Sequence, residues 1–120
     1  MDISVIIPLY NEAESLPELT QWIERVMLEN NYTYEIIFIN DGSTDNSWNI
    51  IEELKNKNAN VHGIKFRRNY GKSPALYCGF ERAKGDVVIT MEDDPICVVR
   101  SKKDSSMSVG LNLLKTDGDA

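Results

Sequence analysis

The sequence predicts an α/β protein in which a mostly parallel sheet is covered by helices. Short apolar runs rich in β-branched residues alternate with segments whose apolar residues recur at helical spacing. The order is strand, helix, strand, helix, strand, helix, strand, and right-handed crossovers between such units give a parallel sheet. The 120 residues suffice for one compact domain and not for two.

The first strand is expected at residues 3–9 (ISVIIPL), and the polar run YNE at residues 10–12 follows it. A helix should come next, because Ser15 and Glu18 have the S-x-x-E spacing of a capping box and Pro17 is tolerated in a first turn. This helix should end at Asn30 and Asn31, and its apolar stripe consists of Leu16, Leu19, Ile23, Val26 and Met27.

The second strand is the centre of the pattern. Four apolar residues at 36–39 run directly into the polar sequence NDGSTD at residues 40–45, which is typical of a strand buried on both faces of a parallel sheet. Open α/β sheets bind ligands at the carboxyl ends of their strands. Asp41 therefore stands where a ligand would be held. A second helix is expected from about Asp45 to Lys57, with a stripe of Trp48, Ile51 and Leu54.

A shorter strand at residues 61–66 leads into a basic loop at residues 67–72 (RRNYGK). Ser73 as N-cap and Pro74 at the first helical position predict a third helix, which Gly85 closes. The buried stripe of this helix consists of Leu76, Phe80 and Ala83.

The fourth strand is expected at residues 86–91 (DVVITM), and it ends in the acidic run Glu92, Asp93 and Asp94. After Pro95 the chain becomes polar, and no further βα unit is predicted. A sheet that stops at its fourth strand leaves an uncovered edge, which predicts a homo-oligomer or aggregation.

Composition excludes several classes of protein. The net charge of −6 and the isoelectric point near 4.7 argue against a nucleic-acid binder, which needs clustered Lys and Arg. Cys78 and Cys97 lack metal-site spacing and indicate a reducing, cytoplasmic setting. Cys78 is expected to be a small buried helix residue, and His62 a surface strand residue. No signal peptide and no membrane span are predicted in this chain.

The polar groups at the strand ends each have a structural interpretation. Asp41 and Asp45 suit a turn and an N-cap, the acidic run at residues 92–94 suits a solvated turn, and the basic loop suits an exposed face. Together they indicate a nucleotide-diphosphate site. Carboxylates bind Mg²⁺ or Mn²⁺, Arg68 and Lys72 suit a diphosphate, and Asp41 suits a nucleobase.

Other site types fit less well. A Walker A loop ending at Gly71-Lys72-Ser73 needs glycine where Phe66 stands, and no G-x-G-x-x-G follows the first strand. A phosphoacceptor domain of the receiver type agrees with the length and acidity. However, its first strand should end in an acidic pair, which the run YNE at residues 10–12 matches poorly.

With these residues placed, the chain resembles the N-terminal half of family 2 glycosyltransferases of the GT-A fold. It is most similar to the dolichol-phosphate mannosyltransferase and bactoprenol glucosyltransferase type. The matching segments, in the family's order, are VIIPLYNEAESLPEL, EIIFINDGSTDNSW and FRRNYGKSPALYCGFERAKGDVVITM. They cover the first ninety or so residues. The resemblance implies a three-layer, Rossmann-like, nucleotide-sugar-binding half domain at residues 1–95, with an atypical tail at residues 96–120.

The resemblance also implies an activity. The family uses a nucleoside-diphosphate sugar and a divalent metal, Mg²⁺ or Mn²⁺, and inverts the anomeric centre. The implied donor is a UDP- or GDP-sugar, the acceptor is a polyprenyl phosphate or a glycan, and the implied location is the cytoplasm at the inner face of a membrane. The implied nucleoside-binding residues are Pro8, Tyr10, Glu12 and Asp41, and those near the phosphates are Arg68 and Lys72.

The metal motif departs from the family pattern of Asp-x-Asp. In one alignment Glu92 and Asp94 replace the two aspartates at the right spacing. In the other, residues were lost and the metal site is gone. The tail carries no likeness to the family's acceptor-binding half, which predicts a truncated or out-of-frame ending with little activity. The alternative function is a non-catalytic nucleotide-binding fragment that needs a partner.

Overall fold

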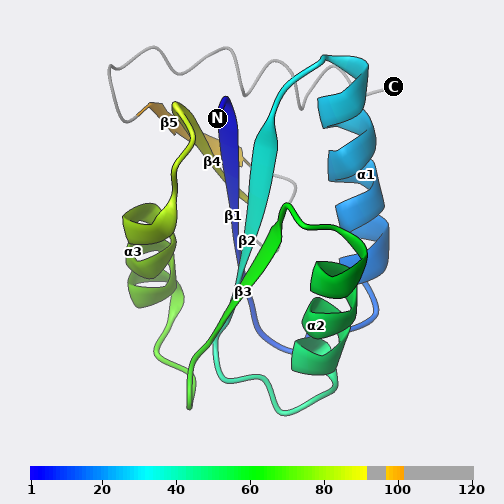
Figure 1. Ribbon diagram of the computed structural model, residues 1–120. Coiled ribbons are helices and arrows are strands. Elements are labelled where there is room, and N and C mark those ends of the chain that lie inside the picture. The colour runs from blue at the N-terminus through cyan, green and yellow to red at the C-terminus, as the bar shows by residue number, and fades with distance from the viewer. Residues whose placement is uncertain (92–96, 102–120) are drawn as a thin grey trace.

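The computed structural model describes residues 1–91 and 97–101, which form five strands and three helices (Figure 1). In chain order, the elements are β1 (Ile3–Leu9), α1 (Leu16–Glu29), β2 (Tyr34–Asn40), α2 (Ser47–Lys57), β3 (Val61–Lys65), α3 (Lys72–Arg82), β4 (Val87–Met91) and β5 (Cys97–Ser101). The predicted alternation of strands and helices is confirmed through β4. Among the helices described, none is long and apolar enough to span a membrane.

The five strands form one sheet in the order β3-β2-β1-β4-β5. β1 to β4 are parallel to one another, and only β5 runs antiparallel, against β4. The sheet is therefore mostly parallel, as predicted. The order 3-2-1-4 is that of a Rossmann-type sheet, whereas receiver domains have the order 2-1-3-4-5. The receiver interpretation is therefore wrong.

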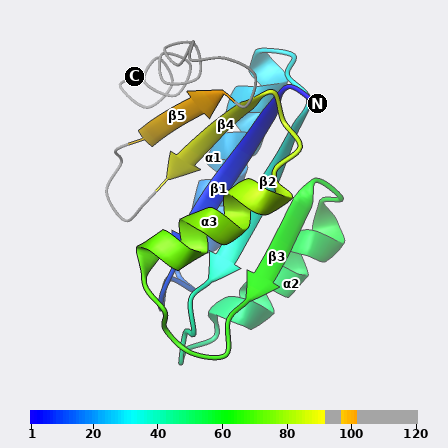
Figure 2. The same ribbon diagram turned by 90° about the vertical axis from the view of Figure 1, so that its left-hand side faces the viewer.

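Helices cover both faces of the sheet. α1 and α2 lie on one face and α3 lies on the other (Figures 1 and 2). Because successive strand residues point to opposite faces, β2 supplies Ile36 and Phe38 to the core under α1 and α2, and Ile37 and Ile39 to the core under α3. All seven residues of β2 are buried, which explains the continuous apolar run at residues 36–39.

The predicted capping box of α1 is wrong, although the helix and its stripe are confirmed. Ser15 has helical backbone angles and makes no side-chain cap bond to the helix. Its hydroxyl instead donates to the backbone carbonyl of Glu12 at 3.1 Å and to the Glu12 carboxylate at 2.8 Å. The serine thus stabilises the turn before the helix, and Glu12 takes the acceptor role.

The predicted ends of α3 are also wrong. The helix begins at Lys72 with Gly71 as N-cap, so Ser73 lies inside the first turn. It ends at Arg82, and its C-cap residue Ala83 is extended, so Gly85 does not close it. Gly85 is needed for space, because a Cβ there would lie 2.5 Å from the backbone nitrogen of Ser4.

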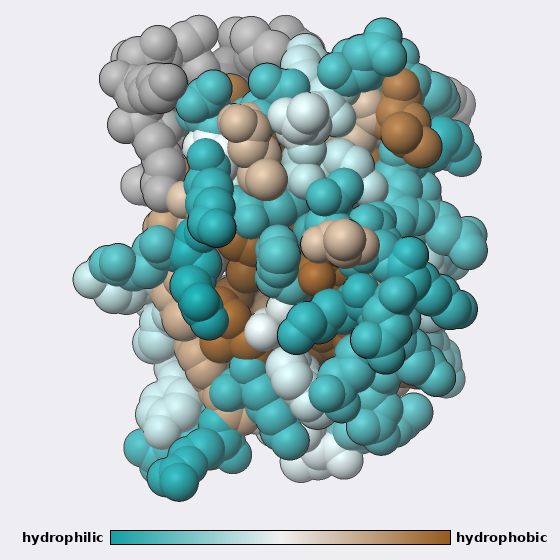
Figure 3. Space-filling view, viewed as in Figure 1, coloured by the Kyte–Doolittle hydropathy of each residue, from teal (hydrophilic) through white to brown (hydrophobic). Residues whose placement is uncertain are grey.

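β5 was not predicted from the sequence. This five-residue strand pairs with β4 from Met91↔Cys97 to Val87↔Ser101 and covers the edge that was expected to be open. A short edge strand with no helical segment before it has no periodicity that distinguishes it from a loop. β3 forms the opposite edge of the sheet. Figure 3, which views the molecule from the side of this edge, shows hydrophobic residues surrounded by hydrophilic ones. The predicted division at residues 95 and 96, and the predicted homo-oligomer, remain predictions.

Candidate functional site

The strand register brings three loops to one end of the sheet. Leu9 of β1 pairs with Asn40 of β2, and Asn40 pairs with Lys65 of β3. These three strands therefore end level with one another. The loops that follow them leave together at the lower end of the molecule in Figure 1. We call this end the rim.

The loop after β1 is joined to the loop after β2 through Asn11. Its side-chain oxygen accepts the backbone N–H of Thr44 at 2.8 Å and that of Asp45 at 3.2 Å. Its own N–H donates to the Ser43 hydroxyl at 2.9 Å. Asn11 has a positive φ of 54°, a conformation that asparagine tolerates better than most residues. Asn11 was not predicted as a site residue, because only its place in the polar run at residues 10–12 distinguishes it in the sequence.

Asp45 has a local role at the start of α2. Its carboxylate accepts the Ser47 hydroxyl at 2.5 Å and the Ser47 N–H at 2.9 Å. It also accepts the N–H of Ala13 at 3.4 Å. The hydrogen bond from the Ser47 hydroxyl, followed by the backbone N–H groups, lowers the pKa of Asp45 below its usual value. These contacts agree with the turn interpretation of Asp45, but its prediction as an N-cap is wrong, because the N-cap of α2 is Asn46.

Asp41 holds the basic loop. Its carboxylate accepts the backbone N–H of Tyr70 at 2.7 Å and that of Gly71 at 3.0 Å. The residue is 5% exposed, and a buried carboxylate is stable only when it is hydrogen-bonded. The neighbouring Asn40 supports the same turn, because its side-chain oxygen accepts the N–H of Ser43 at 3.0 Å. The turn after β2 is therefore fixed to the loop after β3.

Gly42 allows the basic loop to lie directly on this turn. It has a φ of 76°, and a Cβ at this position would lie 2.2 Å from the carbonyl carbon of Arg68 and 2.4 Å from the nitrogen of Asn69. Only glycine fits such a close approach of two backbones. This function of Gly42 was not predicted, since a D-G-S run is also typical of an ordinary turn.

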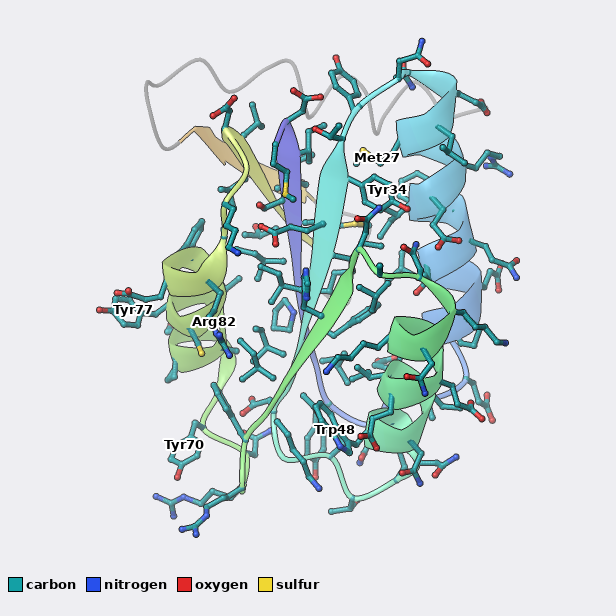
Figure 4. All side chains as sticks on the ribbon, in the orientation of Figure 1. Met27, Tyr34, Trp48, Tyr70, Tyr77 and Arg82 are labelled. Atoms are coloured by element: carbon teal, nitrogen blue, oxygen red, sulfur yellow. The ribbon has the colours of Figure 1, made fainter. Side chains whose placement is uncertain are left out.

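Aromatic rings order the exposed part of the basic loop. The guanidinium carbon of Arg68 lies 4.8 Å from the centre of the Tyr70 ring, a cation–π distance. The Tyr70 ring packs edge-on against Phe66, with centroids 5.6 Å apart. Figure 4 shows Tyr70 at the rim end of the molecule. Arg68 is exposed and is presented from a defined position.

The other predicted nucleotide-site residues come from two elements. Pro8 is buried in β1, Tyr10 is 45% exposed just beyond it, and Glu12 is half-buried. Lys72 is the first residue of α3. The fold thus brings the backbones of all six predicted residues to the rim region, and the side chain of Asp41 is bonded to another of the three loops.

The predicted metal ligands Glu92 and Asp94 lie outside the described residues. Within residues 1–91 and 97–101 there is no group of three or more His, Cys, Asp or Glu side chains that suits a metal ion. Two minor predictions concern single residues. His62 is half-exposed as expected, although Glu35 lies 3.6 Å from its Nε2, and Cys78 is half-buried rather than buried.

Solved structures share this fold. The chain is similar to S. aureus TarS residues 1–349 in complex with UDP, with a TM-score of 0.67 and 26% identity over 78% of this chain and 28% of that one. It is also similar in fold to the mannosyltransferase PcManGT from Pyrobaculum calidifontis in complex with GDP-Man and Mn2+. That likeness has a TM-score of 0.65 and 23% identity, over 75% of this chain and 26% of the other.

Curated relatives are more similar in sequence. The undecaprenyl-phosphate 4-deoxy-4-formamido-L-arabinose transferases of Pseudomonas fluorescens (strain SBW25) and Proteus mirabilis (strain HI4320) are each 44% identical over 93 residues. The match covers 77% of this chain but only 27% and 28% of those relatives. The family model described as glycosyl transferase family 2 matches residues 4–100. The rim loops and nearly all of the Rossmann-type sheet lie within this range, and the chain belongs to glycosyl transferase family 2.

Proposed function

We propose that this chain binds the nucleoside-diphosphate sugar donor of a glycosyl transfer reaction. The observation that carries the proposal is the buried Asp41, which accepts two backbone N–H groups of the basic loop. Through this contact a carboxylate and an exposed arginine lie on the same rim. A nucleotide needs both, because its base offers N–H donors and its diphosphate is an anion.

Asp41 is proposed to recognise the base. A carboxylate has about four acceptor positions, and the described residues fill two of them. Uracil and guanine each present a ring N–H donor, so a UDP- or GDP-sugar suits the remaining positions. Pro8, Tyr10 and Glu12 are proposed to line the nucleoside pocket beside Asp41.

Arg68 and Lys72 are proposed to lie near the diphosphate. A guanidinium binds phosphate oxygens in a fixed geometry, and positive charge stabilises a departing diphosphate. Residues 54–80 contain six Lys or Arg and no Asp or Glu, although the whole chain has a net charge of −6. This stretch gives an acidic protein a local attraction for phosphate.

The metal and the acceptor complete the proposal. Mg²⁺ or Mn²⁺, held by Glu92 and Asp94, would neutralise charge on the leaving diphosphate. A polyprenyl phosphate acceptor is favoured over a glycan, because the 44% identical relatives are named as undecaprenyl-phosphate sugar transferases. Its phosphate oxygen is already ionised at neutral pH, so inversion needs little help from a general base. Such an acceptor would place the protein at the cytoplasmic face of a membrane.

Calorimetric titration with UDP and GDP, each with and without Mn²⁺, tests donor binding. We expect one of the two nucleotides to bind, and we expect Asp41→Ala to weaken binding at least about ten-fold, as for a lost hydrogen bond to a charged group. Glu92→Ala is the matched carboxylate variant, and it should remove only the part of the affinity that depends on Mn²⁺. An affinity for both nucleotides that Asp41→Ala leaves unchanged would contradict the proposal.

The second candidate function is a nucleotide-binding fragment without catalysis. This chain spans about a quarter of the length of the curated relatives that it matches. In this case the titrations give the same result, but no sugar is transferred unless a partner is added. A transfer assay therefore separates the two candidates.

A further inference from the structure

A second buried carboxylate, Glu35, lies on β2 at the end of the strand opposite to Asp41. It is the second residue of β2 and is 3% exposed. One of its oxygens accepts the Ser4 hydroxyl at 2.5 Å and the backbone N–H of Lys84 at 2.7 Å. The other oxygen lies 3.6 Å from His62 Nε2. No part of the proposed donor site uses this residue.

Ser4 continues the same network. Its hydroxyl oxygen accepts the backbone N–H of Gly85 at 2.7 Å, while its hydrogen bond to Glu35 is the one it donates. Gly85 approaches Ser4 so closely that it has no room for a Cβ. Lys84 and Gly85 form the turn between α3 and β4, so Glu35 and Ser4 fix the carboxyl-terminal end of α3 to the sheet.

Asp41 fixes the other end of the same helix. It accepts the N–H groups of Tyr70 and Gly71, which directly precede α3. Glu35 and Asp41 are six residues apart, about 20 Å along a strand, and the eleven residues of α3 span about 16 Å. The two distances are similar, and a carboxylate in β2 and another directly after β2 hold the two ends of one helix.

The middle of α3 leaves little freedom for the helix to slide. Gly79 faces β1, and a Cβ there would lie 2.4 Å from Cγ2 of Ile6. The helix backbone thus packs directly on a β1 side chain. Both ends of α3 are hydrogen-bonded, and its backbone packs against β1 at Gly79. A displacement of the backbone at Lys84 would therefore move the whole helix, including its first turn next to Gly71.

We propose that Glu35 is a positioning residue for the rim. It sets the place of α3, and through α3 it aligns the N–H groups of Tyr70 and Gly71 with Asp41. The relevance to donor binding rests on the proposed function, whereas the alignment itself is a property of the protein without nucleotide. Glu35 does not touch the donor; it acts across the length of one helix.

Amide hydrogen exchange of the 120-residue chain without nucleotide tests the alignment. Glu35→Ala should speed exchange at Tyr70 and Gly71 about ten-fold or more relative to Phe38 in the core, because a charged acceptor of α3 is lost. Glu35→Gln should stay close to the wild type, since a carboxamide oxygen can accept both hydrogen bonds. Val26→Ala is the control: it opens a cavity on the other face, under α1, and should lower the melting temperature without this local effect.

Two results would overturn the inference. One is an exchange rate at Tyr70 and Gly71 that is no faster in Glu35→Ala than in Val26→Ala. The other is a Glu35→Gln variant that behaves like Glu35→Ala. If Glu35→Ala does not fold, Ser4→Ala replaces it, since it removes the acceptor of the Gly85 N–H and should cause the same local effect.

Nucleotide titration of the same variants separates this inference from the proposed function. Weaker binding by Glu35→Ala, with normal binding by Val26→Ala, is expected if the rim is a donor site. If the wild type binds neither UDP nor GDP, the proposed function fails, and the exchange rates still decide the role of Glu35.

Discussion

At the scale of single residues, the rim depends on glycines as much as on charged groups. Gly42 and Gly71 both have positive φ angles, 76° and 99°, and they lie on the two segments that Asp41 joins. Their surroundings differ. A Cβ on Gly42 would lie 2.2 Å from the backbone of Arg68, whereas a Cβ on Gly71 would meet no atom within 4 Å. The pair therefore separates the effect of backbone strain from the effect of lost space.

This difference predicts unequal effects of two alanine substitutions. Gly71→Ala should cost about 1–3 kcal/mol of the free energy of unfolding, from the strained φ alone. Gly42→Ala should cost more, because it also pushes the basic loop away from the turn, and it should weaken nucleotide binding. Urea denaturation of both variants measures the difference. Equal losses would show that the loop moves away from Gly42 without cost.

The role of Asp41 shows what the sequence can and cannot predict at this scale. Its place at a strand end follows from the apolar run that precedes it. Its partners Tyr70 and Gly71 are 29 and 30 residues further along, and they bind through backbone N–H groups. Backbone donors are present in almost every residue, so no side-chain pattern marks these two. Glu35 was likewise not identified, because its partners Lys84 and Gly85 depend on where α3 ends.

At the scale of helices and strands, the elements with the most buried apolar residues were predicted best from the sequence. β1, β2 and α1 have long apolar patterns and were predicted almost to the residue. The ends of α3 were predicted from cap residues, and those predictions were wrong because tertiary contacts set them: Gly71 through Asp41, and Gly85 through Ser4. β5 is a short edge strand with one neighbour, so its sequence carries little constraint.

The packing of α3 on β1 predicts an unusual response to a substitution that favours helix. Gly79→Ala should destabilise the protein by about 1–3 kcal/mol, because overpacking against Ile6 outweighs the gain in helix propensity. Ser73→Ala on the exposed side of the same helix should change stability by at most about 0.5 kcal/mol. Thermal unfolding of the two variants tests this. A Gly79→Ala protein that is more stable than the wild type would show that α3 shifts on the sheet.

At the scale of the whole molecule, the basic stretch of the chain only partly coincides with the rim. The basic stretch of residues 54–80 includes β3, the loop that Asp41 holds and most of α3. The acidic residues of the chain lie outside it. Lys55 and Lys57 lie in the last turn of α2, away from the rim, whereas Arg67 and Arg68 belong to the basic loop. We therefore expect a phosphate-bearing ligand to be attracted to the basic loop of an otherwise acidic protein.

For the molecule as a whole, we predict that donor binding and sugar transfer can be separated. The polypeptide of these 120 residues should bind a nucleotide but transfer sugar to a polyprenyl phosphate at least about a thousand-fold more slowly than a full-length relative, because positioning the acceptor supplies much of the rate. A chimera tests this, in which the aligned 93 residues replace their counterpart in the 44% identical Pseudomonas fluorescens relative. The chimera should transfer sugar, and its Asp41→Ala variant should not. Transfer by the 120-residue chain at the rate of the chimera would show that this half of the family fold also positions the acceptor.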